Sequence, residues 1–140
     1  MSFHPYLFFS GDCAAAFQRY HEIFGGDLQI MTNAELPEGV DQMPGAEPQH
    51  VMHASLTLGE SRLLMGSDDP TGTGGPKVGI AVAYVAPDEG EAKRVFDALA
   101  DGGETTLPFG TTFWSRGFGM CTDRFGIPWM VDTVGEPQPG

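Results

Sequence analysis

The sequence predicts an α+β fold in which two βαβββ modules form a curved mixed sheet around a groove. Three observations lead to this fold class. Each half of the chain has several short segments with the pattern of β-strands, one stretch with the apolar periodicity of a helix, and a Gly–Gly pair that ends this stretch. The pattern repeats after about half of the chain, and a repeat of that length is typical of two modules in one domain. We expect residues 1–140 to form one domain, with module one at about 3–68 and module two at about 77–134.

The first module begins with the apolar segment Tyr6–Phe9, which we predict to be a strand. Asp12 follows where its carboxylate would accept hydrogen bonds from the first turn of a helix. The helix ends at Gly25-Gly26, because glycine adopts the left-handed conformation of a C-cap. The apolar face of this helix is formed by Cys13, Phe17, Tyr20 and Phe24. Further strands are predicted over Leu28–Thr32, Val51–Leu58 and Arg62–Gly66.

The second module repeats this order. Asp88 and Glu91 form a capping box before an apolar helical stripe, and Gly102-Gly103 ends the helix. In the last hairpin, Asp123–Gly126 is the turn, with glycine where a positive φ is needed. The strands of this module are predicted over Val78–Val85, Glu104–Leu107, Phe118–Thr122 and Ile127–Thr133.

Composition and charge exclude several classes of function. The chain has a formal net charge of −12 at pH 7 and only 7 Lys and Arg residues. Nucleic acids and anionic membranes are bound by clustered basic side chains, so we expect neither as a partner. The sequence shows no membrane-spanning apolar stretch and no signal-peptide pattern. Cys13 and Cys121 are not in a CxxC motif, which favours reduced thiols and a cytoplasmic protein.

The segment Thr111–Val134 is the most distinctive part of the sequence, because it contains both Trp residues, an Arg, a Cys and several Phe residues. The pattern of apolar residues in this segment favours a hairpin buried in the core. Aromatic and Met side chains beside Arg116 and Asp132 are also typical of a groove wall. We expect the strand faces opposite the helices to line the groove. In the last hairpin a one-residue slip would exchange one face for the other. In the first module the groove residues are His53, Ser55 and Thr57.

Several of these side chains are candidates for chemistry. His53 is the candidate catalytic residue, as a general base or a hydrogen-bonding group; the alternative is a histidine hydrogen-bonded within the sheet. Phe113 and Trp114 would stack on a flat ligand or close the structure. Arg116 would bind a carboxylate or phosphate, or be a solvated loop residue. The ligand-binding candidates are Phe113, Trp114, Arg116, Met65, Met130 and Asp132.

Three segments of the chain resemble a known family: PYLFFSGDCAAAFQRYHEIFGG, HVMHASLTLGESRLLMGSD and TTFWSRGFGMCTDRFGIPWMV. They are similar to the PhnB-like branch of the vicinal oxygen chelate superfamily, which includes glyoxalase I, extradiol dioxygenases and bleomycin-resistance proteins. The resemblance implies the glyoxalase-like fold and a homodimer. This branch often carries a ubiquinone-methyltransferase label. The chain lacks the Gly-rich loop between a parallel strand and a helix that would support such an activity by holding S-adenosylmethionine.

The resemblance also bears on metal binding. Metal-dependent members place His and Glu ligands on the first and fourth strands of each module, where a divalent ion polarises two substrate oxygens. By position, these sites fall on Pro5 and near Met65, Ile80 and Met130, and none of these supplies a hard-metal ligand. We therefore expect no cofactor and no full metal site. The ligands from which a relocated site for a divalent metal would be built are His4, His53 and Asp132.

Two main function classes follow. The first hypothesis is a protein that binds a small aromatic or amphipathic molecule in the groove without a full metal site. The alternative is a metal-dependent lyase, isomerase or dioxygenase of the same scaffold with a relocated ligand set. A third, weaker alternative is an interaction protein whose groove is filled core. If the chain is an enzyme, the resemblance implies a glyoxalase- or dioxygenase-type activity.

Overall fold

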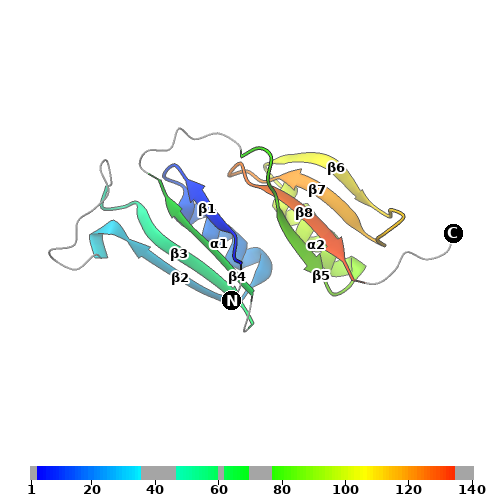
Figure 1. Cartoon of the computed structure of the whole chain (residues 1–140), viewed down its shortest axis with the longest axis horizontal. Coiled ribbons are helices and arrows are strands. Elements are labelled where there is room, and N and C mark those ends of the chain that lie inside the picture. The colour runs from blue at the N-terminus through cyan, green and yellow to red at the C-terminus, as the bar shows by residue number, and fades with distance from the viewer. Residues whose placement is uncertain (1–2, 36–46, 60–61, 70–76, 135–140) are drawn as a thin grey trace. The chain divides into compact units, whose positions relative to one another are not determined.

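The computed structural model describes residues 3–35, 47–59, 62–69 and 77–134. The chain divides into two compact units, Met1–Gly74 and Gly75–Gly140. Each unit contains one four-stranded mixed sheet and one α-helix, so the predicted α+β class and the βαβββ order of each half are confirmed (Figure 1). The groove between the modules depends on their mutual placement and stays a prediction. In the described part of the chain, no helix is long and apolar enough to cross a membrane.

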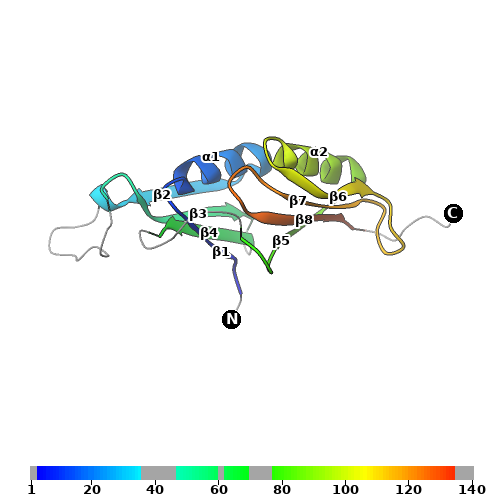
Figure 2. The ribbon, with the colours of Figure 1, turned by 90° about the horizontal axis from the view of Figure 1, so that it is seen from above.

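The first unit buries one face of its sheet under its helix. Its elements are β1 (Tyr6–Phe9), α1 (Cys13–Phe24), β2 (Asp27–Thr32), the 3-10 helix η1 (Asn33–Glu35), β3 (Val51–Leu58) and β4 (Arg62–Asp68). The sheet order is β1-β4-β3-β2, with β1 parallel to β4, and α1 lies on one face (Figure 2). A Cβ at Gly66 would lie 2.7 Å from Phe17 Cε1 of α1, which places Gly66 on the covered face. The buried apolar strand residues of this unit are Leu7, Phe9, Val51, Ala54, Leu56 and Leu64.

The start of α1 is held by a carboxylate from a distant strand. Asp12 makes no side-chain cap hydrogen bond, so the predicted N-cap interaction is wrong. Instead, Asp68 Oδ1 accepts hydrogen bonds from the backbone N–H groups of Gly11 (2.9 Å) and Cys13 (3.0 Å). Asp68 Oδ2 accepts from the Val51 N–H at 2.8 Å. One buried carboxylate therefore joins the end of β4 to the start of α1 and the start of β3.

The second unit has the same architecture. Its elements are β5 (Val82–Ala86), α2 (Glu89–Ala100), β6 (Glu104–Gly110), β7 (Phe118–Thr122) and β8 (Pro128–Thr133), and the sheet order is β5-β8-β7-β6. Asp88 caps α2 as predicted, because its Oδ1 accepts from the Glu91 N–H at 2.8 Å. The Glu91 carboxylate pairs with Arg94, one turn further along the helix. The strand predicted to begin at Val78 begins at Val82, and the side chains of Val78 and Ile80 are exposed.

The last hairpin is fixed by a second buried carboxylate. Gly126 has a φ of 86°, as the predicted turn requires. Asp123 Oδ1 accepts from the N–H groups of Phe125 (2.9 Å) and Ile127 (3.0 Å), and Oδ2 accepts from Trp129 Nε1 at 2.9 Å. Trp129 is buried and belongs to the core of the second unit.

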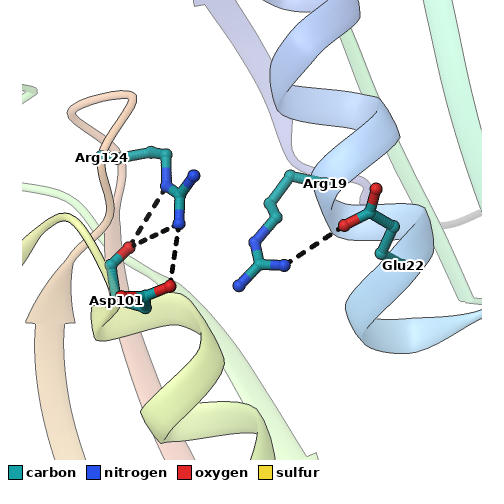
Figure 3. A network of polar contacts seen from close by, with 4 residues as sticks. All are labelled: Arg19, Glu22, Asp101 and Arg124. Atoms are coloured by element: carbon teal, nitrogen blue, oxygen red, sulfur yellow. Dashed lines mark hydrogen bonds and ion pairs between the residues drawn. The ribbon is translucent and has the colours of Figure 1, made fainter.

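Ion pairs form on the surface of each unit. In the second unit, Arg124 Nη2 lies 3.1 Å from Asp101 Oδ2, so the hairpin turn is joined to the end of α2 (Figure 3). In the first unit, Arg19 Nη1 lies 3.2 Å from Glu22 Oε2 along α1 (Figure 3). Exposed pairs of this kind contribute at most about 1 kcal/mol each, so the buried carboxylates matter more for the fold.

Candidate functional site: the strand faces opposite the helices

The first sheet presents aromatic and Met side chains on the face opposite α1. Tyr6 and Phe8 alternate with the buried Leu7 and Phe9, and their exposed fractions are 38% and 49%. The strand register aligns these side chains across the sheet, because Tyr6 lies opposite Met65, Met65 opposite Ser55, and Met31 opposite His53. We call this surface the first open face, formed by Tyr6, Phe8, Met31, His53, Ser55 and Met65.

A hydrogen-bonded pair of rings forms the centre of the first open face. The hydroxyl of Tyr6 lies 3.3 Å from Nδ1 of His53, and the two ring centroids are 5.8 Å apart. The Phe8 ring lies 5.1 Å from the Tyr6 ring. A phenol that donates to a neutral imidazole places the ring proton on Nε2, which then donates to a further group. Within the described residues, His53 Nε2 makes no hydrogen bond, so it is the ring atom open to a ligand.

Sequence reasoning found only part of this face. The pairing of β3 places His53, Ser55 and Thr57 opposite the helix, on the face that alternation predicted. Tyr6 and Phe8 were missed, because all four residues of β1 are apolar or aromatic and show no alternation. The signal that identifies them is the parallel pairing of β1 with β4, which brings Tyr6 opposite Met65. Such a pairing between distant segments is not visible in a single sequence.

The register of the last hairpin decides which of its faces lies opposite α2. A Cβ at Gly119 would lie 2.8 Å from Phe96 Cε2 of α2, so Gly119 is on the helix side. Because side chains alternate along a strand, Phe118 and Met120 point away from α2, and Met120 lies opposite Met130. Asp132, two residues after Met130, is on the same side as Met130. We call this surface the second open face, formed by Phe118, Met120, Met130 and Asp132.

An aromatic loop between β6 and β7 lies against the second open face. The rings of Trp114 and Phe118 pack edge to face at 5.2 Å between centroids, and the rings of Phe113 and Trp114 do so at 4.7 Å. Phe118 is buried, whereas Trp114 is 46% and Phe113 is 89% exposed. The structure therefore brings Trp114 to this face and leaves Phe113 at the outer tip of the loop. Arg116 is exposed on the same loop.

The two cysteines are buried and belong to the helix-side cores. Burial, the carboxylate of Asp68 and that of Asp12 raise the pKa of the Cys13 thiol far above its ordinary value. Burial and the nearby carboxylate of Asp123 raise the pKa of Cys121 to about 11. Both thiols are therefore neutral at pH 7 and act as small apolar side chains rather than nucleophiles.

Comparison with known proteins identifies the family. Residues 2–131 match the Glyoxalase/Bleomycin resistance protein/Dioxygenase superfamily. The chain belongs to this superfamily. It is 31% identical over 147 residues to Protein YjdN of Escherichia coli (strain K12), with 99% of each protein covered.

Solved structures agree with this assignment. The structure of protein PA1353 from Pseudomonas aeruginosa has a TM-score of 0.82 and 40% identity, with 95% of this chain and 97% of that chain covered. A putative 3-demethylubiquinone-9 3-methyltransferase, PhnB protein, from Bacillus cereus has a TM-score of 0.72 and 26% identity, with 96% and 100% covered. The second of these confirms the resemblance to PhnB-like proteins.

The described residues do not fit a metal site of the His/Glu type. Within the ranges that the structure describes, no three His, Cys, Asp or Glu side chains gather around a common point. Met65 on β4 and Met130 on β8 occupy the fourth-strand positions. Their thioethers are poor ligands for hard divalent ions. Asp132 Oδ1 already accepts hydrogen bonds from the Ser115 hydroxyl and from the Thr133 N–H. Met130 pairs with Ala83, which also supplies no ligand atom.

Proposed function

We propose that this protein binds a small aromatic or amphipathic molecule on its open faces, without a full metal site. The observation that carries the proposal is the ring pair of Tyr6 and His53 beside Phe8 on the first open face, where Tyr6 and Phe8 are partly exposed. Large aromatic side chains are normally buried under another layer, so their presence beside a polar handle supports ligand binding.

The chemistry of the first open face indicates how a ligand would be held. A flat ring would stack on Tyr6 and Phe8, and polarisable thioethers from Met31 and Met65 would adapt to its outline. His53 Nε2, as a donor, would hydrogen-bond to a carbonyl, phenolate or ether oxygen of the ligand. The ligand class that this face supports is therefore a planar compound with one hydrogen-bond acceptor at its edge.

A methyltransferase activity, which the name of the Bacillus cereus relative suggests for that protein, has no support in the described residues of this chain. Methyl donors of the nucleoside type are held by a Gly-rich loop at the start of a helix. Here the start of α1 is occupied by Asp68, whose Oδ1 already accepts the N–H groups of Gly11 and Cys13. The start of α2 is occupied in the same way by Asp88.

We also propose that the protein is a cytoplasmic homodimer. The resemblance to PhnB-like proteins supports the dimer, and so do the exposed apolar side chains of Val78, Ile80 and Phe113. The free, buried thiols of Cys13 and Cys121 support a reducing compartment. Light scattering during size-exclusion chromatography measures the mass directly, and a monomer at micromolar concentration would contradict the proposed dimer.

Ligand binding is tested with a library of neutral planar aromatic compounds in a thermal-shift assay. We expect compounds that raise the midpoint of the wild type, and we expect His53→Ala and Tyr6→Ala to weaken the Kd of such a compound by about tenfold, which is the value of one lost stacking or hydrogen-bonding contact. Thr57→Ala is the matched control, because Thr57 lies on the same strand face but about 13 Å along β3 from His53. Equal affinity of all three variants, or no stabilising compound at all, would refute the proposal.

A further inference from the structure

The loop that carries Trp114 is held together by its own side chains. Thr112 Oγ1 accepts hydrogen bonds from the N–H groups of Trp114 (3.3 Å) and Ser115 (3.1 Å), and the Thr112 N–H donates to the Ser115 carbonyl at 2.9 Å. Thr111 Oγ1 donates to the Arg116 carbonyl at 3.0 Å. These contacts define the shape of the loop, but none of them joins it to the sheet.

Besides the ring contact between Trp114 and Phe118, a buried side-chain hydrogen bond joins this loop to the sheet. Ser115 has no exposed surface, and its hydroxyl is hydrogen-bonded to Asp132 Oδ1 on β8. The Gly117 N–H donates to Ser115 Oγ at 3.2 Å, and the same carboxylate oxygen accepts the Thr133 N–H at 2.8 Å. Ser115 Oγ also lies 2.9 Å from the Gly117 carbonyl oxygen. Because a hydroxyl has a single proton, it donates to one of these two acceptors, and the charge-assisted bond to the carboxylate is the stronger.

We infer that the Ser115–Asp132 pair is a latch that fixes Trp114 against Phe118 and so makes the indole a rigid stacking surface on the second open face. The inference deepens the proposed function, on which it rests, because it assigns a positioning residue to the binding of a planar ligand. Asp132 then acts through Ser115 and Trp114 rather than by binding a metal or the ligand itself. The exposed fraction of Trp114, 46%, leaves surface for a ligand ring beside its contact with Phe118.

Two features favour a latch over a purely structural role. The buried Phe118 ring is covered by an indole that is itself partly exposed, so the loop presents the indole instead of burying it. Preorganised aromatic side chains bind ligands more tightly, because the entropy of ordering them is not lost on binding. A loop without the latch would keep its internal shape through Thr112 and lose only its position on the sheet.

Loop order is measured without any ligand, by the ¹⁵N heteronuclear NOE of the tryptophan indole groups. The chain contains 2 Trp residues, so Trp129, which is buried and donates to Asp123, is an internal control in every sample. We expect Ser115→Ala and Asp132→Ala to lower the NOE of Trp114 and to leave that of Trp129 unchanged. Asp132→Asn should retain most of the wild-type NOE, because its amide oxygen still accepts from Ser115 and Thr133. Thr122→Ala is the matched control, because Thr122 lies on β7 on the same side of the sheet as Phe118 and Met120.

Binding is then measured with N-phenyl-1-naphthylamine, a neutral planar fluorophore. We expect Ser115→Ala, Asp132→Ala and Trp114→Ala each to weaken its Kd by about five- to tenfold, and Asp132→Asn to stay within about twofold of the wild type. An unchanged Trp114 NOE in both alanine variants would overturn the latch, and so would an Asp132→Asn variant as weak as Asp132→Ala. Absence of probe binding to the wild type would instead overturn the proposed function, while the NOE would still decide the latch.

Discussion

Replacement of Asp68 by alanine tests whether this single carboxylate organises the first unit. In the wild type the carboxylate accepts three backbone N–H groups, from Gly11, Cys13 and Val51, at 2.8 to 3.0 Å. Alanine removes the carboxylate and leaves these N–H groups without the acceptor that they have in the wild type. The matched control is Asp12→Ala, since Asp12 is exposed and makes no cap hydrogen bond with its side chain.

The expected loss of unfolding free energy depends on how well each N–H donor is shielded from water. The hydrogen bonds to Cys13 and Val51 are buried, whereas the one to Gly11 is only partly buried. An unsatisfied buried donor costs about 1–3 kcal/mol, so the two buried groups together predict a loss of roughly 2–6 kcal/mol of unfolding free energy. Asp12→Ala removes no buried contact and should change the stability by less than about 0.5 kcal/mol.

Native-state hydrogen exchange of the first unit resolves this difference. Since about 1.4 kcal/mol corresponds to a tenfold change in the opening equilibrium, core amides of α1 such as Phe17 and Tyr20 should exchange roughly 30- to 20,000-fold faster in Asp68→Ala. Amides of α2 serve as a reference within the same sample. Exchange in Asp68→Ala no faster than in Asp12→Ala would refute the assignment of the cap to Asp68.

Three further predictions concern packing, the buried thiols and metals. Gly66→Ala should destabilise the protein by about 1–3 kcal/mol in thermal unfolding, because its Cβ would lie 2.7 Å from Phe17 Cε1 and 2.8 Å from the Leu7 carbonyl. Gly110→Ala, which meets no atom within 4 Å, should be neutral, and equal effects would contradict the packing argument. The unfolding free energy should fall as the pH rises from 9 towards 11, because the pKa of Cys121 is about 11 in the folded state and the unfolded thiol ionises first. Urea titrations should show this pH slope reduced in Cys121→Ala, and an unchanged slope would count against it. Nickel, zinc, manganese or iron(II) should not raise the thermal midpoint, and stoichiometric binding that Asp132→Ala abolishes would establish the relocated metal site.

Much of the fold could be predicted from the sequence because its elements are locally encoded. The apolar stripe and capping residue of α2 and the Gly126 turn lie within a few residues of the structure they specify. The cap of α1 could not be predicted, because Asp68 is 55 residues from Cys13 along the chain. Asp12 has the right residue type at the right place, but its side chain makes no cap hydrogen bond, and the first helical N–H, that of Cys13, donates to the distant carboxylate of Asp68.

In the candidate site, too, the residues with a local sequence pattern could be predicted and those placed by distant contacts could not. Alternation along β3 was enough to place His53 on the open face, since a strand with mixed polar and apolar residues shows its own period. The partner of His53, Tyr6, comes from a strand without such a period. In the second unit, the chemistry of Asp132 depends on Ser115, which lies in a loop and has no periodic pattern at all. Contacts of this kind are set by tertiary structure.

Equivalent positions of the two units show where the repeat has diverged. The backbone pairing is shared, because Ala54 lies opposite Gly66 in the first unit as Gly119 lies opposite Val131 in the second. The residue before each of these is His53 in one unit and Phe118 in the other. The helix-side positions of both sheets are buried and small or apolar, whereas the open faces differ: one has a histidine–phenol pair and the other an indole held by a serine–carboxylate latch. A ligand on the first open face would therefore meet a histidine–phenol pair, and a ligand on the second would meet an indole, so the two faces offer unlike contacts.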